Sequence, residues 1–170
     1  MICGFKGKHP EFHQSCFVAP SADVLGDIQM GEESSIWYQV VVRGDILPIR
    51  IGKRTNIQDH SLLHTTPGGT PTLVGDDVTV GHRVTLHGCR IHDRVLLGMG
   101  STILDGAEVG EECIVGAGSL ITKGMQVPPR SLVMGAPARV VRALKSEEIE
   151  FLRKSAMGYV LNAKFHKENF

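Results

Sequence analysis

The sequence predicts an all-β fold, a parallel β-helix of hexapeptide repeats with a C-terminal α-helix. Three observations support this fold class: aliphatic side chains recur every six residues, a glycine directly follows many of them, and helical spacing replaces this period near the C-terminus. The 170 residues suit one domain. Within it, we expect the β-helix to occupy residues 1–140 and the helix, packed on it, to occupy residues 141–170.

The six-residue period runs through most of the chain in four segments. An amphipathic helix would repeat about every 3.6 residues and an alternating strand about every 2, so neither explains it. In a hexapeptide repeat, each hexad supplies a short strand and a turn, and the aliphatic side chain points inward. Three hexads then make one triangular coil, and stacked coils lie about 4.8 Å apart. The segments begin at Val18, Ile51, Val74 and Ile91, and the last continues to Val133.

The three faces of each predicted coil are called A, B and C. Face A begins with Ile51, Val74 and Ile91, face B with Ile57, Val80 and Leu97, and face C with Leu63, Leu86 and Ile103. Every break in the period follows face C: three residues are inserted before Ile51, five are inserted before Val74, and one is missing before Ile91. Irregular loops therefore cluster at one corner of the prism, and functional residues are often carried on loops held by a rigid scaffold.

The six-residue pattern resembles that of the hexapeptide-repeat proteins, which fold as left-handed β-helices. The resemblance, rather than the spacing, implies the left hand. A solenoid of this kind needs its terminal coils covered, and its outer faces can pair with copies of itself.

The chain changes character after the stretch 135–138. Ser146, Glu147 and Glu148 are typical of a helix start, with an N-cap followed by acidic residues in the first turn. Apolar residues then fall at helical spacing, at Ile149, Leu152, Ala156, Tyr159 or Val160, and Ala163. The pattern predicts one amphipathic helix that lies along the coils.

Composition argues against several partners. Eighteen basic residues balance eighteen acidic ones without a basic block, so we expect no nucleic acid partner. No apolar run approaches the roughly 20 residues needed to span a membrane, and residues 1–12 do not read as a signal peptide. The four cysteines lack C-x-x-C spacing, which indicates reduced thiols in a cytoplasmic protein. They are Cys3, Cys16, Cys89 and Cys113.

Candidate metal ligands follow the aliphatic ladder in two columns. Directly after the face C aliphatic residues come Arg43, His64 and His87, one coil apart. Two positions after the face B aliphatic residues stand Tyr38, Asp59, His82 and Met99. Two imidazoles about 4.8 Å apart at the backbone can reach one ion through Zn–N bonds of about 2.0–2.1 Å. His82 lies on another face, so we expect a neighbouring subunit to supply it, giving a homotrimer with three sites at its interfaces.

The predicted ligand set indicates a reaction. Three neutral histidines with an open fourth position are typical of catalytic rather than structural zinc. Such a metal lowers the pKa of bound water to about 7. Attack of the resulting hydroxide on carbon dioxide would give bicarbonate. Fe²⁺ or Co²⁺ would also fit three histidines, so the pattern indicates a metal site without fixing the metal as Zn²⁺.

Five short motifs stand in a characteristic order and spacing. They are Val42-Arg43-Gly44-Asp45, Asn56-Ile57-Gln58-Asp59, Leu63-His64, Val80-Gly81-His82 and Leu86-His87-Gly88-Cys89. Together they resemble the signature of the gamma carbonic anhydrase family, whose first and last histidines come from one subunit and whose middle histidine comes from the next. The resemblance implies that Arg43 and Asp45 pair across the interface and that Asp59 joins their network. It also implies that Gln58 hydrogen-bonds the metal-bound water and that Tyr159 is an active-site residue.

Two features depart from the family pattern. Ile46 stands where well-studied enzymes of the family carry a Glu after Arg-Gly-Asp. The loop 65–72 lacks the acidic residue with which those enzymes move protons. Fast hydration requires the proton to leave the site after each turnover, and His60, His92 or dissolved buffer could accept it in place of the missing acidic residue. The sequence therefore predicts metal binding more firmly than strong anhydrase activity.

Three other functions stay open. A metal-dependent hydrolase, such as a thioesterase, could use the same site. A hexapeptide acyltransferase shares the solenoid, but its single catalytic histidine does not explain three converging ones. A trimeric scaffold could keep the metal for stability alone. At the level of single residues, we expect Cys89 to be small and buried rather than a ligand, and Tyr159 to serve packing as readily as catalysis.

Overall fold

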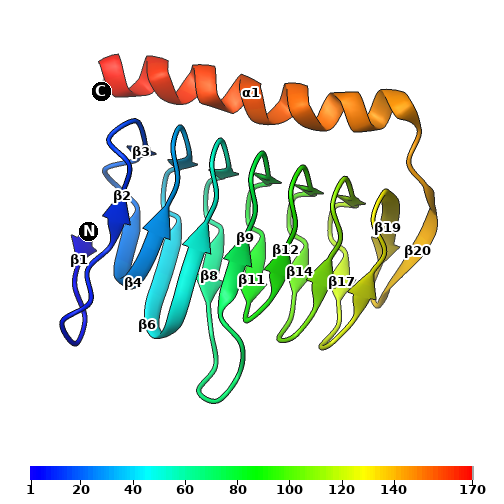
Figure 1. The fold of residues 1–170 in the computed structure, drawn as a ribbon, viewed down its shortest axis with the longest axis horizontal. Coiled ribbons are helices and arrows are strands. Elements are labelled where there is room, and N and C mark those ends of the chain that lie inside the picture. The colour runs from blue at the N-terminus through cyan, green and yellow to red at the C-terminus, as the bar shows by residue number, and fades with distance from the viewer. Residues whose placement is uncertain (170) are drawn as a thin grey trace.

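The computed structural model describes residues 1–169 and has the predicted architecture (Figure 1). It is a left-handed parallel β-helix whose coils stack along the long axis, with one helix running beside them. Most strands are two or three residues long and are separated by turns. The fold class expected from the six-residue period is confirmed.

Face B is a sheet of eight strands, parallel throughout except for its last pair. Its strands are β3 (Phe17–Val18), β5 (Ser35–Ile36), β7 (Asn56–Ile57), β10 (Thr79–Val80), β13 (Leu96–Leu97), β16 (Ile114–Val115), β19 (Ser131–Gly135) and β20 (Ala138–Ala143). The antiparallel pairing of β20 with β19 covers the final coil before the chain turns into the helix.

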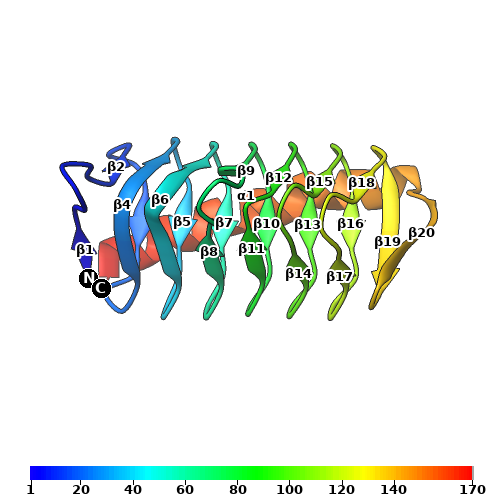
Figure 2. The same ribbon diagram turned by 90° about the horizontal axis from the view of Figure 1, so that it is seen from below.

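Faces A and C form one twelve-stranded sheet because β4 (Asp23–Met30) and β6 (Val41–Ile51) cross the corner between them without a break. Face C continues with β8 (Leu62–His64), β11 (Thr85–His87), β14 (Thr102–Ile103) and β17 (Leu120–Ile121). Face A continues with β9 (Thr72–Val74), β12 (Arg90–Ile91), β15 (Glu108–Val109) and β18 (Gln126–Val127). Two strands that the sequence did not suggest, β1 (Ile2–Cys3) and β2 (Glu11–Phe12), pair with β4. They cover the first coil as β20 covers the last (Figure 2).

The strand register places the aliphatic residues of successive coils directly opposite one another. On face C, Leu86 pairs with Leu63 on one side and with Ile103 on the other. On face B, Ile57 pairs with Val80. All five side chains are completely buried, and burying each one stabilises the fold by about 1.5–3 kcal/mol. The inward ladder read from the sequence is therefore the core.

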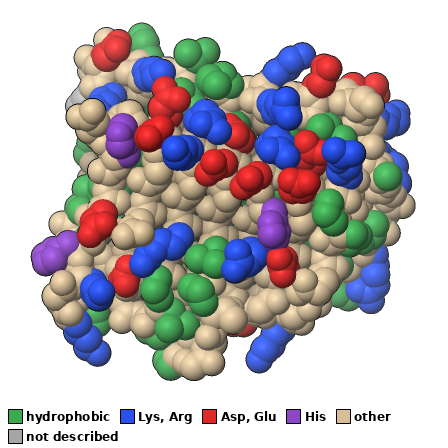
Figure 3. Space-filling model, in the orientation of Figure 1, with side chains coloured by type: hydrophobic (Ala, Val, Ile, Leu, Met, Phe, Trp, Pro, Cys, Tyr) green, Lys and Arg blue, Asp and Glu red, His purple; other side chains and the backbone are tan. Residues whose placement is uncertain are grey.

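The corner between faces A and B carries charges of alternating sign, one residue per coil. Arg54 donates from Nε and Nη2 to the two carboxylate oxygens of Asp77, at 2.6 and 2.8 Å. Further along, Glu112 accepts from Arg94 at 3.0 Å and from Arg130 at 2.8 Å. All five residues have positive φ, between 52° and 57°. On the face seen in Figure 3, acidic and basic side chains are interspersed in a band across the coils, without a patch of one sign.

The helix α1 (Ser146–Asn169) runs beside the length of the solenoid, contacts face B at β3, β5, β7 and β10, and brings the two chain ends to the same end of the molecule (Figures 1 and 2). Its buried residues are Leu152, Ala156, Val160 and Ala163. At the start of the helix, the Glu148 carboxylate accepts a hydrogen bond from the backbone N–H of Lys145 at 2.8 Å and so caps the first turn. In the described residues 1–169, no helix combines the length and the apolar character that crossing a membrane requires.

Candidate metal centre

Two of the three predicted ligands, His64 and His87, stand side by side on face C. They end the neighbouring strands β8 and β11 and are direct partners in the strand register. Their ring centroids are 5.3 Å apart, and the planes meet at 63°. The side chains are 13% and 23% exposed, so both rings are accessible from the surface. The structure thus brings these two imidazoles together as the column predicts.

The backbone around this pair is held by a buried hydroxyl. Thr72 Oγ1, on β9, donates to the carbonyl of His64 at 2.7 Å and accepts the N–H of Gly88 at 2.9 Å. The same Gly88 N–H lies 3.1 Å from the His64 carbonyl. Because Gly88 directly follows His87, Thr72 ties together the backbones that carry the two imidazoles. The loop that follows His64 is the longest break in the repeat, and it rejoins the β-helix at Thr72.

His64 is surrounded by the Arg-Gly-Asp segment of β6. Asp45 Oδ1 lies 3.2 Å from His64 Nε2, and Arg43 Nη2 lies 3.4 Å from His64 Nδ1. Within the chain, Arg43 Nη1 also donates to Asp45 Oδ2 at 2.6 Å. Burial, and then the positive charge of Arg43, lower the pKa of His64 below its ordinary value, so the imidazole is neutral at pH 7.

Asp45 remains ionised beside this histidine. Burial alone would raise its pKa, but the hydrogen bond and the charge of Arg43 outweigh burial and hold the pKa below the ordinary value. Arg43 therefore favours both a neutral His64 and a charged Asp45. A neutral imidazole is the form that binds a metal.

His82, the third predicted ligand, stands on another face and is far more exposed. It follows β10 on face B, and its side chain is 44% exposed. Its Nδ1 lies 2.8 Å from Asp59 Oδ2, one coil back in the same column, and Asp59 Oδ1 accepts the N–H of Tyr38 at 3.3 Å. Among residues 1–169, no three His, Cys, Asp or Glu side chains of one chain come together as a metal site. Within the described chain, His82 is thus separate from the pair formed by His64 and His87.

Gln58 and Tyr159 lie near the Asp59 column. The Gln58 side chain is buried, and its Nε2 donates to Asn56 Oδ1 at 3.1 Å. The Tyr159 ring packs edge-on against Trp37, with 5.6 Å between centroids. Burial raises the pKa of Tyr159, and the negative charge of Asp59 adds to the rise, so the hydroxyl is protonated at neutral pH. Tyr159 thus combines a packing role with a place beside the His82 column.

One functional candidate at this corner, Asp105, was not predicted from the sequence. Asp105 Oδ2 lies 2.9 Å from His87 Nδ1, so each predicted ligand has a carboxylate beside its ring. Asp105 stands two positions after the face C aliphatic Ile103, one coil beyond Gly88, which stands two positions after Leu86. An acidic residue at that turn position, one coil from His87, was the signal that could have identified it.

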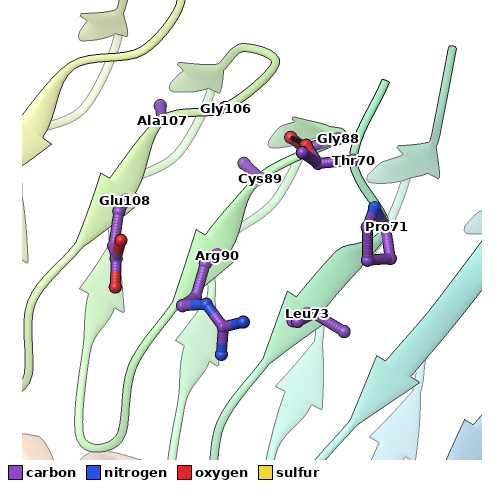
Figure 4. Close-up of a pocket in the computed structure, with 9 residues that line it drawn as sticks. All are labelled: Thr70, Pro71, Leu73, Gly88, Cys89, Arg90, Gly106, Ala107 and Glu108. Atoms are coloured by element: carbon purple, nitrogen blue, oxygen red, sulfur yellow. Dashed lines mark hydrogen bonds between the residues drawn. The ribbon is translucent and has the colours of Figure 1, made fainter. Parts of the chain in front are cut away.

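A cavity of about 170 Å³ opens beside the same corner (Figure 4). It is lined by Thr70, Pro71, Leu73, Gly88, Cys89, Arg90, Gly106, Ala107 and Glu108. None of the three histidines lines it, so it is not the metal centre. Cys89 is buried there, and burial raises the pKa of its thiol to about 12. A thiol of that pKa is protonated at pH 7, in agreement with a packing role.

The repeat, the coils and the strand register define a hexapeptide-repeat β-helix protein in which two histidines are paired on face C. Residues 88–123 match the family described as bacterial transferase hexapeptide (six repeats), and residues 71–104 match the hexapeptide repeat of succinyl-transferase. A carbonic anhydrase of Geobacillus kaustophilus is 47% identical over 98% of this chain and 91% of its own length. The chain belongs to the gamma carbonic anhydrase family, and the resemblance seen in the sequence is confirmed.

Two further relatives agree with this family. Gamma carbonic anhydrase 1, mitochondrial, of Arabidopsis thaliana is 43% identical over 94% of this chain. The chain spans 60% of the length of that plant protein. Among solved structures, a hexapeptide transferase family protein from Anaplasma phagocytophilum superimposes with a TM-score of 0.92 at 37% identity, over 96% of both chains.

Proposed function

We propose that the protein hydrates carbon dioxide to bicarbonate with zinc held by His64 and His87 of one subunit and His82 of the next, in a homotrimer. The observation that carries this proposal is the register pairing of His64 with His87 at a surface corner. His82 stands on another face of the solenoid. A neighbouring copy of the chain would be needed to bring this third histidine to the other two. Relatives named carbonic anhydrase support the reaction class.

The donor set fits a catalytic metal. His82 and His87 both engage a carboxylate through Nδ1, which leaves Nε2 of each ring as the atom available to an ion. His64 is neutral because burial and Arg43 lower its pKa. Three imidazoles suit Zn²⁺ with an open position, and Fe²⁺ or Co²⁺ would be accepted by the same atoms.

Zinc bound there would supply a hydroxide nucleophile at neutral pH by lowering the pKa of bound water to about 7. We propose that Gln58, buried beside the His82 column, orients the reacting water, and that Tyr159 and Asp59 shape the wall around it. In the single chain Asp45 occupies Nε2 of His64. Pairing of Asp45 with Arg43 of the next subunit would draw the carboxylate away and free that nitrogen.

Proton removal is expected to limit the rate. The loop 65–71 contains no Asp, Glu or His that could accept a proton from the site. Of the remaining acceptors, His60, His92 and dissolved buffer, we propose that buffer takes up the proton of each turnover. We therefore propose a slow enzyme whose rate increases with buffer concentration.

A cytoplasmic location is part of the proposal. The four cysteines are unpaired in the described chain, and unpaired thiols suit a reducing compartment. Carbon dioxide and bicarbonate, together with two further copies of the chain, are the proposed partners.

Stopped-flow hydration tests this function on protein purified without oxygen and analysed for metal. We expect about one zinc per chain and hydration that disappears in His64→Ala. Hydrolysis of thioesters without hydration would support a hydrolase on the same site instead. Turnover of acetyl-CoA by metal-free protein would support the acyltransferase alternative, and zinc without any turnover would support a scaffold.

A further inference from the structure

Asp105 is the one carboxylate at the candidate centre that lies outside the motifs of the sequence. It follows β14 on face C, one coil beyond His87, and its Oδ2 lies 2.9 Å from His87 Nδ1. Its other oxygen, Oδ1, is buried and has no hydrogen-bond partner among residues 1–169. A buried carboxylate oxygen without a donor is costly. A carboxylate is expected to stay in such a costly position where a functional site requires it.

The space around this carboxylate depends on glycine. Gly88 has a φ of +55°, and a Cβ at that position would lie 2.6 Å from Asp105 Oδ1. A Cβ at Gly69, in the loop after His64, would lie 3.5 Å from the same oxygen, which is ordinary van der Waals contact. The absence of a side chain at Gly88, directly after His87, is therefore what leaves room for Asp105. The Asp105 carboxylate lies between Gly88 of the preceding coil and Gly69 of the loop after His64.

We propose that Asp105 is a positioning residue that fixes the tautomer and the orientation of His87. The carboxylate accepts the proton on Nδ1, so the lone pair of His87 is held on Nε2, the nitrogen that faces away from Asp105. Outer carboxylates act on metal-bound histidines in this way, and their loss typically weakens metal binding by about 10–100-fold. The inference rests on the proposed metal function for its consequence, but the tautomer of His87 is a property of the metal-free chain.

The first test is zinc affinity, measured by competition with a chelator. Asp105→Ala should bind zinc about 10–100-fold more weakly than the unmodified protein. The matched control is Glu108→Ala, which removes the carboxylate 2.5 Å from His92 Nε2, a pair of the same kind on face A. Circular dichroism confirms that each variant folds. Equal zinc affinity of Asp105→Ala and the unmodified protein would overturn the inference.

The second test reads the tautomer directly, by ¹⁵N NMR of the histidine rings in metal-free protein. We expect His87 to carry its proton on Nδ1 in the unmodified protein and to shift toward the Nε2 tautomer in Asp105→Ala. Asp105→Glu should restore the Nδ1 tautomer in part, which loss of packing alone would not explain. An unchanged tautomer in Asp105→Ala would overturn the inference. If the unmodified protein binds no zinc, the proposed function fails, and the NMR result still decides the role of Asp105.

Discussion

Removal of His82 separates metal binding from folding. The side chain is 44% exposed, and its polar contact is Asp59 at 2.8 Å. Loss of an exposed pair of this kind changes stability by no more than about 1 kcal/mol. Zinc affinity should fall by more than about 100-fold, because even an outer partner of a ligand is worth about 10–100-fold. That factor corresponds to more than about 2.7 kcal/mol of binding free energy.

The assay for His82→Ala combines chelator competition, which gives zinc affinity, with urea unfolding, which gives stability. The control is His92→Ala, because His92 is 42% exposed and also pairs with a carboxylate, Glu108, on a face outside the candidate centre. We expect the control to bind zinc like the unmodified protein. If His82→Ala binds zinc with unchanged affinity, the third ligand is not His82 and the intersubunit site is wrong.

Two other predictions concern assembly and pH. Arg43→Ala should shift sedimentation toward smaller species, since the partner of Asp45 at the proposed interface is lost and a charge stays unpaired; an unchanged sedimentation profile would argue against that role. Hydrogen bonds from Arg142 and from the Lys145 backbone lower the pKa of Glu148 to about 2. Its contribution to stability is therefore complete above the ordinary pKa of about 4.3 and is lost as pH falls toward about 2. Thermal unfolding of Glu148→Gln and the unmodified protein should differ at pH 7 and converge only below about pH 2, and a constant difference would contradict this.

Much of the fold could be predicted because the spacing of residues along the chain determines their place in each coil. A period of six fixes which side chain points inward, so pairs such as Leu63 with Leu86 follow from counting. The same counting placed His64 beside His87. It could not reveal β1 and β2, because these strands precede the periodic segment and pair with β4 by their position in space.

Contacts between coils were harder to predict than positions within them. Asp105 reaches His87 from a turn one coil away, where the lack of a side chain at Gly88 leaves room for the carboxylate. The ion pairs at the corner between faces A and B, such as Arg54 with Asp77, recur at the coil period and were present in the sequence. Aliphatic residues alone defined the repeat in our reading, so this charge pattern was missed.

The role of a neighbouring copy follows from the separation of His82 from the other two histidines. The period of six places residues on faces but contains no information about which faces of two copies meet. In the proposed site, the exposed His82 ring of one chain would complete the donor set that the accessible pair on face C begins in another. The proposed function therefore requires that two chains share each site.

Subunit complementation tests that claim most directly. His82→Ala chains and His64→Ala chains are each expected to bind little zinc alone. Unfolded together and reassembled at equal amounts, they should recover about one intact site for every four chains, since each mixed trimer pairs one intact His64–His87 corner with one intact His82. Zinc titration of the mixture gives this number. If the mixture binds no more zinc than the two variants do separately, the ligands do not come from adjoining subunits.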